Sequence, residues 1–409
     1  MFAETTSEPA IQEQLRNITL GAQDVFPAAD LAKKVASGRP LRIKLGFDPT
    51  KPDLHLGHAV VLGGLRRFQD AGHQIVVIIG DFTARIGDPT GKESARPPMS
   101  TEEIEQNART YLDQLGIVVD ISRAEIRHNS EWLAKLSLAE TISLLGKATV
   151  AQMLSRENFA RRYERGDAIG LHEFLYPLMQ GYDSVQIGAD VELGGTDQRF
   201  NLLVGRDLQA AFGQDPQVCV TYPILEGIDG KEKMSKSLDN YIGLTMPPAE
   251  MYGRTMSIPD ALLASWFPLT TGLSAGDIAA ILAGHPRDAK MRLAREIAAR
   301  YHGAEAARSA EEQFVRQFQQ RELPADIPEV RAPSPSNICA LLVRIGLAKS
   351  TSYVRQLLSE GAIKRHDLAP DGQVGGARVL LDPKEDVEIP PAGFIIQVGK
   401  RRFAKVLPE

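Results

Sequence analysis

The hydrophobic pattern between residues 41 and 88 changes its period twice. Leu41–Leu45 alternates hydrophobic and charged residues, which predicts a strand. After a turn-rich connection, hydrophobic residues recur at helical spacing from Asp53, a candidate N-cap, to Gly72, and this predicts a helix. The unbroken run Ile75–Ile79 predicts a strand buried on both faces of a parallel sheet. A strand–helix–strand unit of this length predicts the start of a doubly wound α/β domain.

Beyond residue 100 the chain is predicted to be mainly helical, with a few short strands. Residues 101–182 have helical spacing, whereas 184–206 and 217–225 return to short hydrophobic strands with an intervening helix. Residues 249–320 are predicted to be wholly helical. Four prolines within 323–335 predict a linker, and beyond it we expect a compact tail of two helices and several short strands.

Composition excludes several classes of protein. The chain has 409 residues, 43% hydrophobic and 24% charged, which is typical of folded domains and not of disordered or fibrous proteins. Its longest hydrophobic run is far shorter than the ~20 residues that cross a bilayer, and its first residues do not resemble a secretory signal. Cys219 and Cys339 are too few for a disulfide framework or a thiolate metal site. We therefore expect a cytoplasmic protein with no membrane partner.

Charge is distributed unevenly along the chain. The net charge is −5, but from Arg331 onward 12 Lys and Arg residues face 8 Asp and Glu residues, which makes this tail +4 and the preceding residues −9. A basic module attached to an acidic body is compatible with RNA binding.

The first candidate functional motif is His55-Leu56-Gly57-His58, at the start of the predicted helix. Residues three apart lie on one helix face, so both imidazoles can project to the same side. A helix N-terminus has unpaired N–H groups and a positive dipole end, which favour a phosphate, and Gly57 would let a flat base approach the backbone. A metal pair or two surface histidines remain alternatives.

The second motif is Lys233-Met234-Ser235-Lys236-Ser237, preceded by two glycines and a further lysine. Two lysines in a loop that closes over a triphosphate would stabilise the charge that develops on leaving pyrophosphate. A solvated lysine-rich loop is the alternative. The chain has no Gly-x-x-x-x-Gly-Lys-Ser/Thr phosphate loop, which would have indicated another nucleotide-binding fold.

Together the two motifs resemble the paired HIGH and KMSKS signatures of class I aminoacyl-tRNA synthetases. His55–His58 differs from the first only by Leu for Ile, and the second is complete. Other segments resemble bacterial tyrosyl-tRNA synthetases, and the tail resembles an S4 RNA-binding module. These segments are Gly46–Thr50, Gly87–Lys92, Tyr176–Asp183 and Gly194–Gln198, and in the tail Leu342–Ile363.

The resemblance implies an α/β fold with a Rossmann-like doubly wound parallel sheet and a helical insertion, followed by an α-helical domain and a small α+β S4-like domain. It implies a catalytic domain over 1–246, with an insertion at about 130–185 that forms a dimer interface, a tRNA-contacting helical domain over 247–325, a linker over 326–336 and an S4-like domain over 337–409.

The resemblance also assigns roles to the amino-acid site. Asp183 is expected to accept the phenol proton of tyrosine, because a buried polar group opposite that hydroxyl leaves phenylalanine with an unpaired partner. The α-ammonium is expected to bind Asp88, Tyr176 and Gln180, with Asn129 as an additional candidate, and Asp48 and Gln198 are expected to line the same pocket. From the residues alone, Asp88 could instead form a turn, and Tyr176 and Gln180 could form a helix–helix contact.

The nucleotide site is assigned in the same way. Asp197 and Gly195 are expected at the ribose, His55 and His58 at the phosphates, and Gly57 at the adenine, with Met234 also in the nucleotide site. The triphosphate is expected to be neutralised by Thr50, Lys92, Arg96, Lys233 and Lys236. Asp197 could equally be a helix N-cap, and Lys92 and Arg96 could be solvated loop charges.

One departure from the family pattern concerns the phenol site. Many relatives have Tyr-Cys before Gly-Phe-Asp-Pro-Thr, and that tyrosine shares the substrate hydroxyl with the aspartate. Here Lys44 and Leu45 occupy these positions, as in a second bacterial subgroup. Lys44 could be the second partner of the phenol, or its side chain could point outward.

The implied reaction joins L-tyrosine to ATP, which enters with Mg²⁺ as a substrate, and then transfers the tyrosyl group to tRNA(Tyr). We expect no tightly bound protein-ligated metal, a homodimer, and neither DNA nor membrane as a partner. Two alternatives remain: the related tryptophan enzyme, and an RNA-binding or regulatory protein that has kept the synthetase fold without catalysis.

Overall fold

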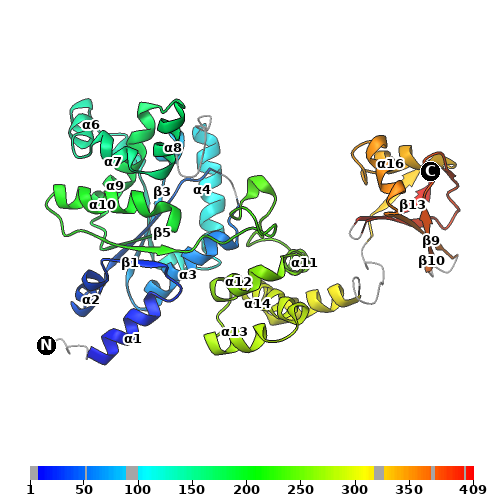
Figure 1. The fold of residues 1–409 in the computed structure, drawn as a ribbon, viewed down its shortest axis with the longest axis horizontal. Helices are drawn as coiled ribbons and strands as arrows, with labels where there is room; N and C mark the ends of the chain where they lie inside the picture. The colour runs from blue at the N-terminus through cyan, green and yellow to red at the C-terminus, as the bar shows by residue number, and fades with distance from the viewer. Residues whose placement is uncertain (1–7, 51–52, 89–99, 317–326, 370–373, 400–401) are drawn as a thin grey trace. The chain divides into compact units, whose positions relative to one another are not determined.

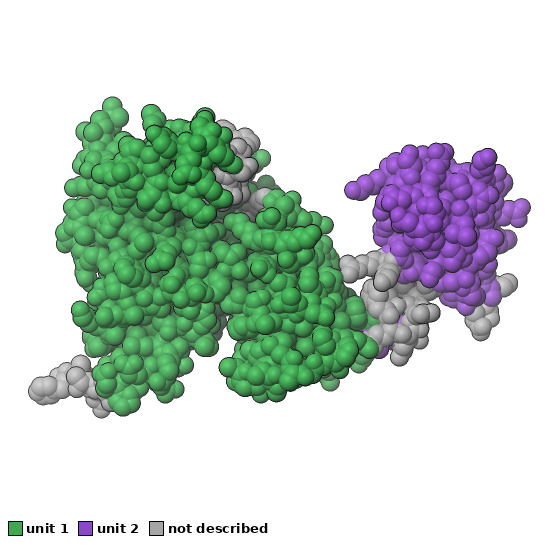
Figure 2. Space-filling model, viewed as in Figure 1, with its two compact units in different colours: residues 1–314 green, residues 315–409 purple. Residues whose placement is uncertain are grey.

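The computed structural model describes the chain except for residues 1–7, 51–52, 89–99, 317–326, 370–373 and 400–401. The chain folds into two compact units, residues 1–314 and 315–409 (Figure 2). Each unit buries a hydrophobic cluster of its own, so each is stabilised by its own core. Among the described residues, no helix is long and hydrophobic enough to span a membrane.

The first unit is built around a six-stranded sheet of order β1-β6-β5-β2-β3-β4 (Figure 1). All neighbouring strands are parallel except β1, which runs antiparallel to β6. The strands are β1 (Asp24–Phe26), β2 (Arg42–Phe47), β3 (Gln74–Ile79), β4 (Ala124–His128), β5 (Val191–Gly195) and β6 (Val218–Tyr222). From β2 the chain proceeds to β3 and β4 on one side, and then returns to β5 and β6 on the other. The predicted doubly wound sheet is confirmed, and its switch point lies between β2 and β5, where such sheets bind ligands.

Helices cover both faces of this sheet. The alternating pattern of β3 explains how: Ile75 and Val77 belong to the main core, whereas Val76 and Ile78 pack with Trp132 in a second cluster. The helices are α1 (Glu8–Ile18), α2 (Ala28–Ala36), α3 (Leu56–Asp70), α4 (Thr101–Leu115), α5 (Ser130–Leu133), α6 (Leu138–Leu145), α7 (Val150–Leu154), α8 (Glu157–Arg165), α9 (Leu175–Ile187) and α10 (Arg199–Ala211). Short 3₁₀ turns occur at Thr83–Arg85, Ile121–Arg123, Leu171–Phe174, Thr196–Gln198, Lys236–Leu238 and Asp260–Leu262.

The helix predicted from Asp53 begins later than expected. His55 is its N-cap and Leu56 its first residue. The preceding backbone is occupied elsewhere: the Leu54 N–H donates to Gln114 Oε1 (2.7 Å), and the Leu56 N–H donates to the Ile242 carbonyl (2.9 Å). These tertiary hydrogen bonds hold Leu54 and His55 outside the helix, which sequence spacing alone does not reveal.

The predicted helical region after the sheet consists of α11 (Pro248–Met256), α12 (Leu263–Thr270), α13 (Ala275–Leu282) and α14 (Pro286–Phe314). Its side chains Trp266, Phe267 and Leu293 belong to the same core cluster as Leu56, so this region packs within the first unit. Helix α14 is kinked at Gly303, whose φ of 84° is accessible mainly to glycine.

The second unit has a five-stranded sheet of order β10-β9-β12-β13-β7 and a small two-stranded sheet, β11-β8. Its elements are β7 (Glu329–Ala332), β8 (Ser336–Asn337), α15 (Ile338–Arg344), α16 (Thr351–Ser359), β9 (Ile363–Leu368), β10 (Val374–Leu380), β11 (Asp386–Val387), β12 (Phe394–Val398) and β13 (Arg402–Pro408). The expected linker over 326–336 needs correction, because β7 lies inside it. Val330 and Ala332 alternate toward the core and β7 pairs in parallel with β13, although prolines flank the strand.

Candidate active site

A single pocket at the switch point collects almost every predicted site residue. Its volume is about 400 Å³, and its walls come from the ends of β2 and β5, the start of α3, helix α9 and the loop around Lys233. Sixteen predicted residues line it: Asp48, Thr50, His55, Gly57, His58, Asp88, Asn129, Tyr176, Gln180, Asp183, Gly195, Asp197, Gln198, Lys233, Met234 and Lys236. The two others, Lys92 and Arg96, lie outside the described residues.

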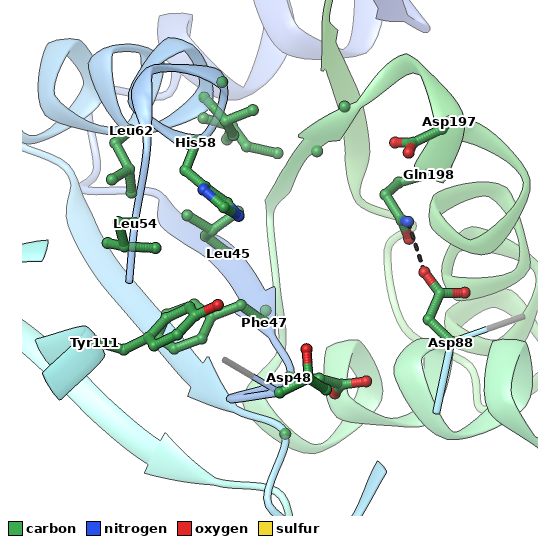
Figure 3. A pocket seen from close by; sticks show the side chains of 18 of the residues that line it. Leu45, Phe47, Asp48, Leu54, His58, Leu62, Asp88, Tyr111, Asp197 and Gln198 are labelled. Carbon is green, nitrogen blue, oxygen red and sulfur yellow. Dashed lines mark hydrogen bonds between the residues drawn. The ribbon is translucent and has the colours of Figure 1, made fainter. Parts of the chain in front are cut away.

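The pocket has a hydrophobic wall and a polar wall. Figure 3 shows Leu45, Leu54 and Leu62 on the side of His58, facing the polar residues Asp88 and Gln198 across the cavity. A hydrophobic wall suits a flat ring, whereas the carboxylates and amides opposite suit an ammonium group and hydroxyls. One ligand with both characters, or two ligands side by side, would match this surface.

The two histidines lie together at the N-terminus of α3, with their ring centroids 3.9 Å apart. The backbone N–H of His55 donates to Nδ1 of His58 (3.2 Å), so the proton of a neutral His58 resides on Nε2, which can donate to a ligand. Burial, assisted by the positive charge of Lys233, lowers the pKa of His58 to about 4. His58 is therefore a neutral hydrogen-bond donor near pH 7.

Gly57 stands between the histidines, and its missing side chain leaves room at the pocket surface. A Cβ atom there would lie 3.0 Å from the His55 ring and 3.7 Å from Met234, so a larger residue would displace the ring. The predicted close approach of a ligand to this backbone is sterically reasonable.

The lysine-rich loop carries two ammonium groups to the pocket mouth. Lys233 Nζ pairs with Asp197 Oδ2 (3.2 Å), and Lys236 Nζ pairs with Asp53, which lies two residues before His55. Both lysine side chains are partly exposed, so an anionic ligand can compete with these carboxylates. The loop is thus linked by charge to both sides of the pocket.

The predicted ammonium-binding residues Tyr176 and Asp88 each have a hydrogen-bonding partner in the pocket. Tyr176 Oη donates to Asp48 Oδ2 (3.0 Å), and Gln198 Nε2 donates to Asp88 Oδ2 (2.8 Å). Arg156 pairs with Asp88 Oδ1 (3.3 Å). Burial and the neighbouring carboxylates raise the pKa of Tyr176 well above its usual value, so its hydroxyl keeps its proton. Two carboxylates beside a hydroxyl form a suitable site for an ammonium group.

Asp183 lies at the deep end of the pocket and is 3% exposed. Trp132 Nε1 donates to Oδ1 (2.8 Å) and Asn129 Nδ2 donates to Oδ2 (3.3 Å). Burial raises the pKa of Asp183 to about 7, while the charge of Lys44 and these two donors oppose that rise. Asn129, the additional candidate for the ammonium group, thus also contacts the expected phenol partner.

Comparisons with known proteins agree with this geometry. A family model described as tRNA synthetases class I (W and Y) matches residues 36–319. The tyrosine–tRNA ligase of Moorella thermoacetica is 50% identical over 98% of this chain and 97% of its own length, and that of Idiomarina loihiensis is 47% identical over 97% and 98%. This chain belongs to the tyrosine–tRNA ligase family.

Solved structures of the family share the fold. A truncated mitochondrial tyrosyl-tRNA synthetase of Aspergillus nidulans is 25% identical, with a TM-score of 0.61 over 75% of this chain and 94% of that one. The tyrosyl-tRNA synthetase of Archaeoglobus fulgidus complexed with L-tyrosine is also 25% identical, with a TM-score of 0.56 over 74% and 99%.

Several residues that this member of the tyrosine–tRNA ligase family places around the pocket were not predicted from its sequence. Trp132 and Arg156 hold the carboxylates of Asp183 and Asp88, and Glu192 pairs with Lys44 behind the pocket. Glu192 could have been singled out from the sequence, because it is the one charged residue within the hydrophobic strand β5. Trp132 and Arg156 lie in the region 101–182 that was predicted to be mainly helical, and side-chain partners there cannot be deduced from spacing.

The position of Lys44 matches neither of the two alternatives that the sequence left open. Its side chain is fully buried, so it does not point outward, and it is not part of the pocket lining. Its ammonium group instead contacts Glu192, Ser184 and the backbone of Gln180. This chain thus places a buried positive charge behind the pocket wall.

Among the described residues, no group of three or more His, Cys, Asp and Glu side chains is arranged to hold a metal ion. Lys233 and Lys236 line the pocket, where their ammonium groups can neutralise an anionic ligand.

Proposed function

We propose that this chain activates L-tyrosine with ATP·Mg²⁺ and transfers the tyrosyl group to the 3′-terminal adenosine of tRNA(Tyr). The observation that carries the proposal is one pocket with a buried carboxylate, Asp183, at its deep end and a neutral histidine with two lysines at its mouth. A phenol fits the first end and a triphosphate the second. The tyrosine carboxylate and the α-phosphorus of ATP would then meet between them.

In the first step the tyrosine carboxylate attacks the α-phosphorus, and pyrophosphate leaves as tyrosyl-adenylate forms. The carboxylate is already ionised, so no protein base is required. His58 donates from Nε2 to a phosphate oxygen, and Lys233 and Lys236 neutralise the leaving pyrophosphate. The rate then derives from alignment of the reactants and from charge stabilisation, and no side chain acts as a nucleophile.

The amino-acid end supplies selectivity. We assign the ammonium group to Asp88, Tyr176 and Gln180, with Asp48 and Gln198 supporting them, and the phenol hydroxyl to Asp183. Trp132 and Asn129 already occupy one acceptor position on each oxygen of Asp183, so the carboxylate is held in place before substrate arrives. Phenylalanine would bury this carboxylate without its third donor, at a cost of about 1–3 kcal/mol or more.

Amino-acid-dependent exchange between ATP and pyrophosphate tests the activation step without tRNA. We expect exchange with tyrosine and almost none with phenylalanine or tryptophan. Asp183→Asn should lose most of the tyrosine exchange, whereas Asp113→Asn, a change at an exposed carboxylate of α4 outside the pocket, should retain it. Exchange with tryptophan would favour the related tryptophan enzyme, and folded protein without any exchange would leave the noncatalytic RNA-binding alternative.

We further propose that tRNA binds the helical region 247–325 and the S4-like tail over 337–409, mainly through phosphate contacts and RNA shape. Lys349 and Arg355 are exposed on the second unit, as phosphate contacts require. Their joint replacement by Glu should lower kcat/KM for tRNA at least tenfold and leave pyrophosphate exchange unchanged. Lys384→Glu, also at an exposed position of this unit, is the matched control.

We also propose that the chain forms a homodimer through the insertion at about 130–185. Helices α6, α7 and α8 lie together at one end of the first unit (Figure 1), and this segment exposes large hydrophobic side chains. These are Leu138, Ile142, Leu145, Val150, Tyr163 and Leu171. Sedimentation should give the mass of two chains for the wild type and of one chain for the double variant Leu138→Glu with Leu171→Glu. Leu20→Glu changes an exposed leucine elsewhere and should leave the mass of two chains.

We place the enzyme in the cytoplasm, where its tRNA substrate is found.

A further inference from the structure

Lys44 and Glu192 form a buried ion pair across the switch point of the sheet. Lys44 on β2 and Glu192 on β5 are direct partners in the strand register, and their side chains are 0% and 1% exposed. The Lys44 Nζ to Glu192 Oε1 distance is 3.0 Å. Because an unpaired buried charge is strongly unfavourable, each residue requires the other.

The remaining two donors of the Lys44 ammonium group are directed at helix α9. Nζ donates to the backbone carbonyl of Gln180 (2.7 Å) and to Ser184 Oγ (2.7 Å). All three of its N–H groups therefore have an acceptor. Lys44 thus attaches β2 to the turn of α9 that begins at Gln180 and ends at Ser184.

Glu192 supports the same turn from the next strand. Its Oε1 accepts from Gln180 Nε2 (3.2 Å), and its Oε2 accepts from Ser184 Oγ (3.1 Å) and from Gln217 Nε2 (2.5 Å). The side chain of Gln180, which lines the pocket, is therefore held from behind. The oxygen of the same amide is also held, because Asn201 Nδ2 donates to Gln180 Oε1 (2.9 Å).

We propose that Lys44 and Glu192 are a positioning pair for the amino-acid site, which fixes the Gln180–Ser184 turn and thereby aims Gln180 and Asp183 at the substrate. The inference rests on the proposed function, because it assigns the work of the pair to tyrosine binding. Neither residue touches the substrate, since neither lines the pocket. The pair therefore acts on tyrosine binding from behind the pocket wall, through the turn that it holds.

The charges of the pair also act on Asp183, in opposite directions. Lys44 lowers the pKa of Asp183 and Glu192 raises it. The other groups around this carboxyl are the donors Trp132 and Asn129 and the protonated hydroxyl of Tyr176. An ionised Asp183 is the stronger acceptor for a phenol, so kcat/KM for tyrosine is expected to fall as Asp183 becomes protonated.

Pyrophosphate exchange by full-length Lys44→Met and Glu192→Gln variants tests this inference. For Lys44→Met we expect KM for tyrosine to rise at least tenfold, KM for ATP to stay within twofold, and the acid limb of kcat/KM for tyrosine to move to higher pH. For Glu192→Gln the acid limb should move to lower pH. Ser184→Ala, a smaller change within the same turn, should raise KM for tyrosine severalfold.

Two further variants separate positioning from general stability. The double variant Lys44→Met with Glu192→Met buries no charge and should fold, with its acid limb near the wild-type position but a raised KM for tyrosine. Glu173→Gln disrupts another buried ion pair of the same unit, with Arg162, and should lower the melting temperature without changing KM for tyrosine.

Two results would overturn the positioning role. The first is that the acid limbs of kcat/KM for tyrosine stay in place, or move in the same direction, in the folded single variants. The second is that KM for ATP rises as much as KM for tyrosine. Absence of tyrosine-dependent exchange in the wild-type protein would instead refute the proposed function itself. The two failures are therefore distinguishable.

Discussion

The hydroxyl of Tyr176 donates to Asp48 Oδ2 across 3.0 Å and so ties helix α9 to the residue that follows β2. Lys44, which lies on β2 four residues before Asp48, connects to the same helix one turn further along, at Gln180. Between them the bare backbone of Gly46 lines the pocket. The proposed amino-acid site is therefore a groove between β2 and α9, which are joined to each other at both ends of the groove.

Tyr176→Phe removes the first of these connections without changing the packing volume. Because a hydrogen bond to a carboxylate contributes about 1.5–3 kcal/mol, KM for tyrosine should rise roughly tenfold or more. KM for ATP should remain within twofold, since Tyr176 lies at the amino-acid end. Steady-state pyrophosphate exchange measures both constants, and an equal rise in the two would contradict the assignment.

His58→Asn tests the neutral donor at the start of α3. The loss of one preorganised donor to the reacting phosphate is expected to lower kcat by a factor of about 10²–10³, with little change in KM for tyrosine. The pKa of His58 is held to about 4, so this residue should contribute no pH dependence between pH 5.5 and 8. A wild-type rate that followed a His58 titration observed by NMR near pH 6.5 would contradict its burial.

Asp53→Asn should free Lys236 for the triphosphate. The two side chains are about one-third exposed, so their ion pair is worth only about 0.5 kcal/mol, and KM for ATP should fall two- to threefold. The effect should disappear in high salt, which screens the pair in the wild type. Measuring KM for ATP of the wild type and of Asp53→Asn at two ionic strengths tests this prediction. A raised KM for ATP in the variant at low salt would show that Asp53 itself assists ATP binding.

Asp183 should affect the pH dependence of the free energy of unfolding as well as that of catalysis. Its folded pKa of about 7 exceeds the value of 3.8 expected when unfolded, so between these values the folded protein binds the extra proton. Its contribution to the free energy of unfolding is therefore complete at about pH 4 and is lost as the pH rises through 7.

Urea unfolding of the wild type and of Asp183→Asn across pH 4–7 measures this contribution. The stability of the wild type relative to the variant should decrease with pH by up to about 1.4 kcal/mol per unit. Other carboxyl groups are common to both proteins and cancel in the difference. A difference that is flat or increases with pH would show that Asp183 is ionised in the folded state throughout.

Sequence pattern was sufficient for features that depend on local spacing or on family motifs. The run Ile75–Ile79 became the fully buried strand β3, and His55 and His58 share one side of a helix N-terminus as their spacing predicted. The roles of Lys92 and Arg96 stay predictions, because these residues lie outside the part of the chain that the structure describes.

Features that depend on distant partners could not be predicted. Helix α3 begins after the predicted start at Asp53, because Gln114 and the backbone of Ile242 form hydrogen bonds with the residues that precede it. The strand β7 appeared among prolines because β13, far along the chain, offers an edge to pair with. Lys44 was ambiguous because its interpretation needs Glu192, a residue that only the sheet order brings beside it.

The pairing of β2 with β5 also has a consequence for how the enzyme is made. These neighbouring strands are separated in the chain by β3, β4 and the whole insertion, so a ribosome must release the segment through β5 before they can meet. Chains synthesised only as far as β4 therefore lack the β5 side of the pocket, and Lys44 has no counter-charge until Glu192 arrives. Closure of this long loop is expected to be slow, and a ligand that binds only afterwards would protect the finished domain as a whole from unfolding and proteolysis.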